Sequence, residues 1–140
     1  IAAAAISAGV AYAVLFGAIA PALKPMWLSP RIAEAVRQTR PCGDSVLASS
    51  VYHEPSLVFL LGTETVLTGL AGTARHLLAD PACAMALVPV ADEERLQDLL
   101  MREGKTATRL GVVEGINYSS GDFLDLALYD ISRPQGGDEK

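Results

Sequence analysis

The sequence predicts an α/β fold: an N-terminal transmembrane helix, followed by a mostly parallel layered α/β sheet domain that ends in an antiparallel hairpin. Three observations predict it. Residues 1–23 contain no charged side chain, although 19% of the 140 residues are charged. Between residues 45 and 113, apolar runs of strand length alternate with runs of helical periodicity. The last two strand-like runs are separated by residues 117–121 (NYSSG), whose composition favours a turn.

The uncharged segment, residues 1–23, is expected to be the last helix of a transmembrane bundle. As an α-helix it would extend about 34 Å, slightly more than the hydrocarbon core of a bilayer. Small residues recur at every fourth position along it, namely Ala5, Gly9, Ala13 and Gly17. Such a line of small side chains lets helices approach closely. We therefore expect other transmembrane helices of the same chain as its partners.

Two alternatives remain open for this segment. A secretory signal peptide could end at residues 18–20, but no basic region precedes the apolar stretch in this sequence. A soluble, Ala-rich helix would need a polar face, and none is evident. Because the chain opens on Ile instead of Met, we expect it to be a piece of a longer protein. Trp27 follows the segment at the position of an interfacial aromatic residue.

Residues 24–40 form a basic juxtamembrane segment with a net charge of +3, whereas residues 41–140 carry −8. The segment includes a helix that begins with Ser29 as N-cap and Pro30 at N1 and ends near Thr39. Its cations are candidate contacts for lipid phosphates. They are Lys24, Arg31, Arg37 and Arg40. The alternative is a solvated helix near the headgroups. Alone, the charge would place this segment in the cytoplasm by the positive-inside rule.

The remaining elements follow from apolar periodicity and turn residues. Strands are expected at residues 45–50, 64–68, 83–88, 106–113 and 123–131, and helices at 55–61, 70–79 and 92–103. Together they form one domain, residues 41–132, and the polar residues 133–140 are expected to be a disordered tail. Cys42 and Cys83 lie close to the starts of two predicted strands. A disulfide between them would close a loop of about forty residues and stabilise the domain by about 4 kcal/mol; two free buried thiols are the alternative.

No catalytic constellation is present in the sequence. His53 and His76 are the only histidines, and there is no Gly-x-Ser-x-Gly elbow, Cys-x-x-Cys pair, His-Glu-x-x-His motif or Walker loop. We therefore expect no catalytic residue, metal site or cofactor here. Sixteen acidic against eleven basic residues also argue against nucleic acid as a partner.

Residues 52–68 (YHEPSLVFLLGTETVLT) resemble a passage in the soluble C-terminal domains of bacterial polytopic glycosyltransferases related to the protein O-mannosyltransferases and the lipid A aminoarabinose transferases. The similarity extends from the N-terminal helix to residues 115–121 (GINYSSG), so it covers nearly the whole chain. Residues 52–62 are its most specific part.

The resemblance implies an integral-membrane glycosyltransferase that moves a sugar from a polyprenyl-phosphate donor to a lipid or protein acceptor. It also implies a multi-pass protein of the cytoplasmic (inner) membrane, with residues 41–132 as a periplasmic domain; membrane lipids are expected partners of the chain. The catalytic acidic residues of that superfamily lie in an early extracytoplasmic loop, which these residues do not include. A divalent metal is compatible with the full-length enzyme.

Two polar groups are candidates for binding substrate or for docking the domain onto the membrane portion. Tyr52, His53, Glu54 and Ser56 lie at the C-terminal end of the first predicted strand, where α/β sheets gather ligands. Asn117, Tyr118 and Ser119 lie in the last turn, where Tyr118 could stack on a sugar ring. In the structural alternative, Glu54 and Pro55 start a helix whose Leu57, Phe59 and Leu60 enter the core. The alternative function is a membrane-tethered, non-enzymatic α/β module that binds a ligand or partner.

Overall fold

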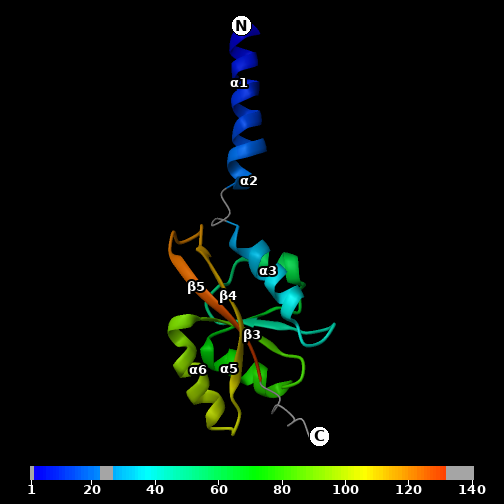
Figure 1. The fold of residues 1–140 in the computed structure, drawn as a ribbon, viewed down its shortest axis with the longest axis vertical. Coiled ribbons are helices and arrows are strands. Elements are labelled where there is room, and N and C mark those ends of the chain that lie inside the picture. The colour runs from blue at the N-terminus through cyan, green and yellow to red at the C-terminus, as the bar shows by residue number, and fades with distance from the viewer. Residues whose placement is uncertain (1, 23–26, 132–140) are drawn as a thin grey trace, which may run out of the picture.

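The computed structural model describes residues 2–22 and 27–131. It contains an N-terminal apolar helix and a mixed α/β domain. Figure 1 shows the helix above the domain. Ile1, Leu23 and Lys24 lie outside the described residues, and so does the predicted disordered tail, residues 133–140.

The apolar helix consists of α1 (Ala2–Val14), the π-helical turn η1 (Leu15–Ile19) and α2 (Ala20–Ala22). Its residues Ala3–Ala22 are long and apolar enough to cross a membrane. Twenty residues rise about 30 Å, the thickness of the hydrocarbon core. None of the side chains from residue 3 to residue 22 is buried, so the domain does not cover this helix.

The domain alternates helices and strands in the predicted order. Its elements are α3 (Leu28–Thr39), β1 (Leu47–Ser49), α4 (Pro55–Leu61), β2 (Val66–Leu67), α5 (Leu70–Ala79), β3 (Met85–Pro89), η3 (Val90–Asp92), α6 (Glu93–Met101), β4 (Ala107–Ile116) and β5 (Phe123–Ile131). The predicted N-cap is wrong: Trp27 occupies that position, and Ser29 is a buried residue of the first turn.

The five strands form one mixed sheet in the order β2-β1-β3-β5-β4. β1 pairs in parallel with β2 and β3, but β5 pairs antiparallel with both β3 and β4. The prediction of a mostly parallel sheet is therefore wrong. The reason is that β5 returns from the final turn into the space between β3 and β4, so the hairpin supplies two antiparallel interfaces. The antiparallel hairpin itself is confirmed.

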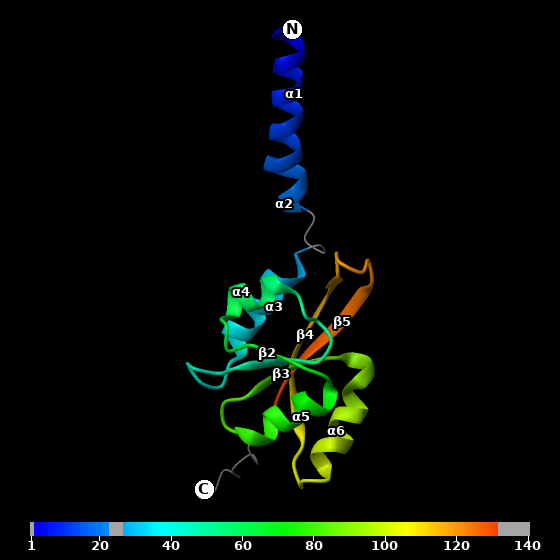
Figure 2. The same cartoon turned by 180° about the vertical axis from the view of Figure 1, so that it is seen from behind.

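The sheet separates two hydrophobic clusters. Because successive side chains of a strand point to opposite faces, Leu126 and Leu128 of β5 enter one cluster, whereas Ala127 and Tyr129 enter the other. The first cluster packs beneath α3 and α4, which Figure 2 shows side by side, and the second packs beneath α5 and α6. Both faces of the central strands are thus buried.

A disulfide joins Cys42 to Cys83, with the two Cα atoms 5.3 Å apart. Cys42 follows α3, and Cys83 precedes β3. The parallel pairing of β1 with β3, which places Leu47 opposite Met85, brings the two segments together. Of the two states that the sequence leaves open for these cysteines, the structure has the bridge.

Candidate functional site

Three hydroxyl groups meet at the start of α3. The Ser29 Oγ lies 2.7 Å from the Tyr52 hydroxyl and 2.8 Å from the Ser56 Oγ. Ser29 and Tyr52 are buried. We call these three residues the hydroxyl cluster. It joins α3, which follows the N-terminal apolar helix, to the segment between β1 and α4 and to the first turn of α4.

The chain between β1 and α4 turns Tyr52 inward. The Ser49 hydroxyl at the end of β1 donates a hydrogen bond to the Tyr52 carbonyl oxygen at 2.8 Å. Glu54 is then extended, and Pro55 begins α4, because proline is well suited to the first helical position. Glu54 is largely buried, with 8% of its surface exposed. Of the four residues predicted at the end of the first strand, Tyr52 and Glu54 are therefore buried in the domain.

Burial raises the pKa of the Tyr52 hydroxyl above its ordinary value. Electrostatic interaction with Glu54 and Tyr118 acts in the same direction, while the hydrogen bonds with Ser29 and Ser56 partly offset the rise in pKa. Tyr52 is consequently a neutral hydroxyl at physiological pH. It can donate or accept a hydrogen bond, but it does not act as a base.

An apolar pocket of about 240 Å³ adjoins the hydroxyl cluster. Ser29 and Ser56 contribute to its wall, together with Tyr118 from the β4–β5 turn. The remaining lining residues are Trp27, Leu28, Pro30, Phe59 and Leu60. Of the seven residues that the sequence suggests for substrate binding or docking, only Ser56 and Tyr118 line this pocket, and Tyr52 supports it from behind.

His53, Asn117 and Ser119 do not join this site. The His53 Nε2 lies 3.1 Å from the carbonyl oxygens of both Ser49 and Thr68, so it holds the ends of β1 and β2 together. The Asn117 side chain accepts a hydrogen bond from the Ser119 backbone N–H at 3.1 Å. These contacts give all three residues a structural role in a turn or a strand end.

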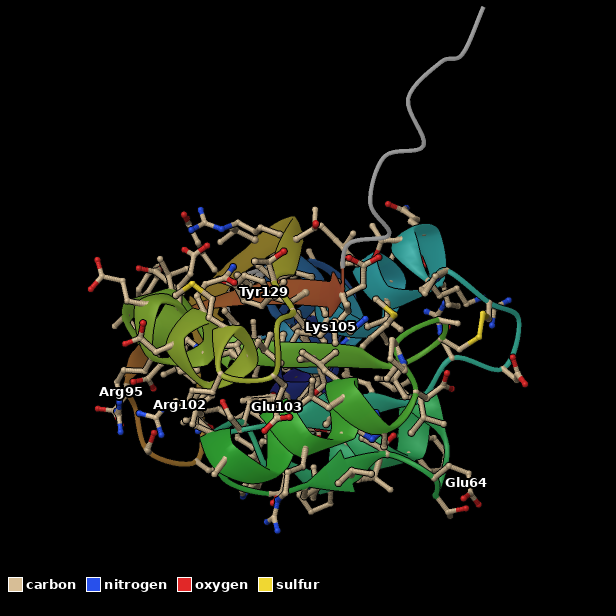
Figure 3. The ribbon with its side chains drawn as sticks, turned by 90° about the horizontal axis from the view of Figure 1, so that it is seen from below. Glu64, Arg95, Arg102, Glu103, Lys105 and Tyr129 are labelled. Atoms are coloured by element: carbon tan, nitrogen blue, oxygen red, sulfur yellow. A yellow bond between two sulfur atoms is a disulfide. The ribbon has the colours of Figure 1, made fainter. Side chains whose placement is uncertain are left out.

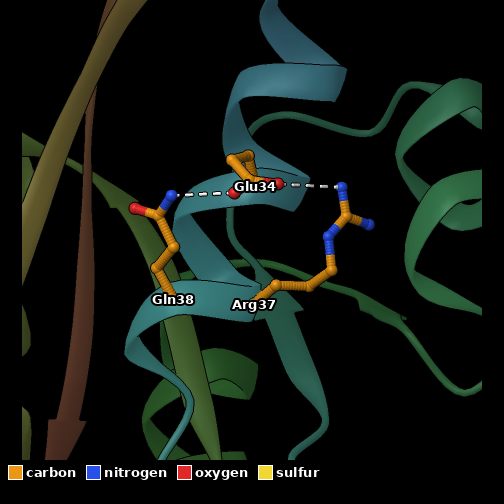
Figure 4. A network of polar contacts seen from close by, with 3 residues as sticks. All are labelled: Glu34, Arg37 and Gln38. Atoms are coloured by element: carbon orange, nitrogen blue, oxygen red, sulfur yellow. Dashed lines mark hydrogen bonds and ion pairs between the residues drawn. The ribbon is translucent and has the colours of Figure 1, made fainter.

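The arginines of the basic segment make contacts within the domain. Arg31 donates to the Glu114 carbonyl oxygen, and Arg40 donates to the Gly43 carbonyl oxygen at 3.0 Å. Arg37 forms an ion pair with Glu34 at 3.4 Å, and Gln38 donates to the other oxygen of that carboxylate (Figure 4). These arginines are spread from the first turn of α3 to its C-cap, so they are not gathered at the end of α3 that follows the apolar helix. Phosphate contact by any of them stays a prediction.

The pocket contains residues that sequence patterns did not single out. Phe59 and Leu60 belong to an apolar run that is expected to enter the core, but Phe59 is 88% exposed and Leu60 is 36% exposed. Only Leu57 of that run is fully buried. The helical spacing was the available signal, because Phe59 lies two residues from Leu57 and hence on another side of α4.

One group of potential metal ligands occurs among the described residues: Cys42, Asp44 and Cys83. Both sulfur atoms are used in the disulfide. This set therefore leaves a single carboxylate, and it does not form a metal site in the bridged protein.

Comparisons with known proteins give no relative for this chain. No protein-family model matches it, and neither does any curated protein or solved structure. A functional proposal therefore has to rest on the residues and the geometry described above.

Proposed function

We propose that this chain is the C-terminal part of an integral-membrane glycosyltransferase that moves a sugar from a polyprenyl-phosphate donor to a lipid or protein acceptor. The chain contributes the last transmembrane helix and a non-catalytic extracytoplasmic domain. One observation carries the proposal: an apolar span, Ala3–Ala22, leads into a disulfide-bonded α/β domain whose hydroxyl cluster and apolar pocket lie at the start of α3.

The disulfide between Cys42 and Cys83 supports an extracytoplasmic domain. Structural disulfides persist in the bacterial periplasm and are rare in the cytosol. The positive-inside rule points the other way, but it concerns cations near the membrane. Here Arg31 and Arg40 are bonded to backbone carbonyl groups of the domain. We therefore give the disulfide more weight and place the domain on the periplasmic side of the inner membrane.

The open surface of the helix supports membership of a transmembrane bundle. A Cβ atom added to Gly9 or to Gly17 would meet nothing within 4 Å. Small residues at such positions allow a neighbouring helix to approach closely. Further membrane spans of the same protein are the proposed partners of this face, and membrane lipids cover the rest.

In this proposal, the hydroxyl cluster fixes the domain relative to the membrane helix. Ser29 lies two residues after Trp27, and its bonds to Tyr52 and Ser56 tie the start of α3 to the sheet and to α4. The pocket then opens beside the acceptor or donor lipid, with Ser29, Ser56 and Tyr118 as its polar groups. The acidic catalytic residues are supplied by the remainder of the enzyme.

A transfer assay on the complete protein tests the proposal. The enzyme encoded by the full reading frame is reconstituted in lipid nanodiscs and supplied with radiolabelled polyprenyl-phosphate sugars. We expect transfer, and we expect Glu54→Ala and Tyr52→Phe each to lower it about five- to tenfold while the domain stays folded. The matched control is Tyr129→Phe, which changes the other fully buried tyrosine and should leave transfer unchanged. Absence of transfer from every polyprenyl-phosphate sugar would overturn the proposal.

A second assay examines sidedness. Alkaline phosphatase, which needs an oxidising compartment, is fused after residue 140 and compared with a fusion to a fluorescent protein that matures in the cytoplasm. Phosphatase activity is the expected result. A fluorescent fusion without phosphatase activity would place the domain in the cytoplasm and would contradict this part of the proposal.

The second candidate is a membrane-tethered, non-enzymatic α/β module that binds a ligand or partner. The observation in its favour is that the Tyr52 hydroxyl is already used within the hydroxyl cluster. The absence of any transfer would favour this candidate, whereas unchanged transfer by both Glu54→Ala and Tyr52→Phe would leave these two residues with a purely structural role.

A further inference from the structure

Large apolar side chains are exposed at the end of the domain nearest the membrane helix. They are Phe59 (88% exposed), Phe123 (62%), Tyr118 (54%) and Trp27 (50%). They come from α4, the β4–β5 hairpin and the residue before α3. In Figures 1 and 2, the start of α3 and the β4–β5 turn both lie at this end. We call these four residues the aromatic surface.

The aromatic surface continues directly from the proposed membrane span. The Trp27 indole N–H donates a hydrogen bond to the Ala20 carbonyl oxygen at 2.9 Å, within the last turn of the helix. Trp27, Phe59 and Tyr118 also line the apolar pocket. Whatever surrounds the end of the helix is therefore also next to these three side chains.

The chemistry of the aromatic surface fits a lipid headgroup region. Trp and Tyr combine an apolar ring with a polar group, and they concentrate where a membrane meets water. The opposite end of the domain is different: Figure 3 views it from that side, where Arg102, Glu103 and Lys105 lie. The basic residues 24–40 are candidate contacts for lipid phosphates, but residues 41–140, which include Phe59, Tyr118 and Phe123, carry a net charge of −8. Charge therefore does not explain a membrane contact of these three side chains, whereas apolar insertion does.

We propose that the aromatic surface inserts into the headgroup interface of the bilayer that the N-terminal helix crosses. The inference rests on the proposed membrane span. The domain is then held at the membrane in two ways, by the covalent link to the helix and by insertion of Phe59, Tyr118 and Phe123. This contact keeps the pocket and the hydroxyl cluster at the membrane surface, where a lipid-linked substrate would arrive.

Depth-dependent fluorescence quenching tests the insertion. The chain has a single tryptophan, Trp27, so a Trp27→Phe background allows one new probe at a time. The 140-residue chain is reconstituted in phosphatidylcholine vesicles whose acyl chains carry bromine at a shallow or a deep position. Phe59→Trp and Phe123→Trp place probes on the aromatic surface. Met101→Trp, at a site that is 55% exposed at the end of α6, is the matched control.

We expect shallow bromine to quench the probes at positions 59 and 123 more strongly than deep bromine, as for insertion of about 5–10 Å. The probe at position 101 should not be quenched. High salt and added anionic lipid should leave quenching unchanged, because the contact is apolar. Two results would overturn the proposal. One is quenching at positions 59 and 123 that is no stronger than at position 101. The other is protection of these two probes from bromine by a second copy of the chain, detected in cross-linked dimers.

The unaltered chain separates this inference from the proposed function. If Trp27 is quenched and the new probes are not, the helix is in the membrane and only the insertion of the aromatic surface is wrong. If Trp27 is also unquenched, the membrane span itself is wrong, and the proposed function fails with it.

Discussion

The two faces of the sheet have similar apolar packing but differ in their polar content. Each cluster contains one fully buried tyrosine: Tyr52 on the α3–α4 face and Tyr129 on the α5–α6 face. The Tyr52 hydroxyl bonds with Ser29. Among the residues that the structure describes, the Tyr129 hydroxyl has no hydrogen-bond partner. The buried tyrosine hydroxyl is thus hydrogen-bonded on the face that leads to the N-terminal apolar helix and unpartnered on the other.

The different surroundings of the two tyrosine hydroxyls distinguish the roles of the two faces. A buried hydroxyl without a partner costs free energy, so Tyr129 remains for the packing of its ring. Burial raises the pKa of Tyr129, and the nearby Arg109 guanidinium lowers it in part without reaching hydrogen-bond geometry. The α5–α6 face is therefore a packing surface, whereas the α3–α4 face also positions the hydroxyl cluster.

Loss of the disulfide should have a large effect on both faces at once. The disulfide connects the segment after α3 to the segment before β3, across 41 residues. Its removal by Cys42→Ser with Cys83→Ser should lower the free energy of unfolding by about 4 kcal/mol, because the unfolded chain gains freedom. Urea denaturation followed by circular dichroism measures the change. An unchanged midpoint would mean that the bridge does not stabilise the domain.

Core truncation should affect the two faces equally. Leu57 in α4 and Leu96 in α6 are both fully buried, one in each cluster. Leu57→Ala and Leu96→Ala should each lower the free energy of unfolding by about 2–5 kcal/mol. Because the sheet separates the two sites, the double variant should show an additive loss. A strongly non-additive loss in urea denaturation would show that the two clusters are not independent.

Removal of the tyrosine hydroxyls should separate the faces. Tyr52→Phe removes a partner of Ser29 and should destabilise the domain by about 1 kcal/mol. Tyr129→Phe removes an unpartnered buried hydroxyl and should be neutral or stabilising by up to about 1 kcal/mol. Thermal and urea unfolding of the two variants provide the comparison. Equal losses would contradict the contrast between the faces.

Alkaline pH should destabilise the protein through both tyrosines. In each case the pKa in the folded state is raised above the ordinary value of 10.0, which means that the folded protein favours the neutral hydroxyl. The free energy of unfolding is therefore at its full value below that pH, and it falls as the pH rises through the folded-state pKa. Urea titrations from about pH 9 to about pH 11 should show this decline, and Tyr52→Phe and Tyr129→Phe should each reduce it. A decline that neither variant reduces would assign it to other groups.

The smallest effect on stability is expected at the aromatic surface. Phe59 is 88% exposed, so Phe59→Ser should change the free energy of unfolding in detergent by no more than about 0.5 kcal/mol. The same variant should weaken membrane contact, measured as shallow-bromine quenching of a Phe123→Trp probe in the Trp27→Phe background. A large loss of stability would show instead that Phe59 packs within the domain.

Local signals predicted most element positions. Pro55 at the start of α4 and Pro81 soon after α5 place the bounds of those helices, and β5 also begins and ends as predicted. The order of the strands depends on pairing between distant segments, so the insertion of β5 between β3 and β4 was not evident. At Ser29, a tertiary hydrogen bond to Tyr52 took the place of the expected helix cap.

The sequence indicated the positions of the candidate residues along the chain, but it did not indicate the direction in which each side chain points. Two of the residues that follow the first strand, Tyr52 and Ser56, lie near the start of α3, where the Ser29 hydroxyl links them; their role in binding stays a prediction. The direction of each side chain depends on the turn that follows β1, and that turn sends His53 toward Thr68 instead. Phe59 belongs to an apolar run, and only the packing of α4 decides which of its side chains stay outside.

The π-helical turn η1 changes the path of the small residues along the N-terminal apolar helix. In an α-helix, positions four residues apart advance by about 40° around the axis, so the small residues Ala5, Gly9 and Ala13 drift sideways. Hydrogen bonds in a π-helix reach one residue further, and each residue there turns the chain less. Gly17 lies within η1. The wider turn therefore brings Gly17 back toward the line above Ala13, which straightens this seam close to the end of the helix that joins the domain.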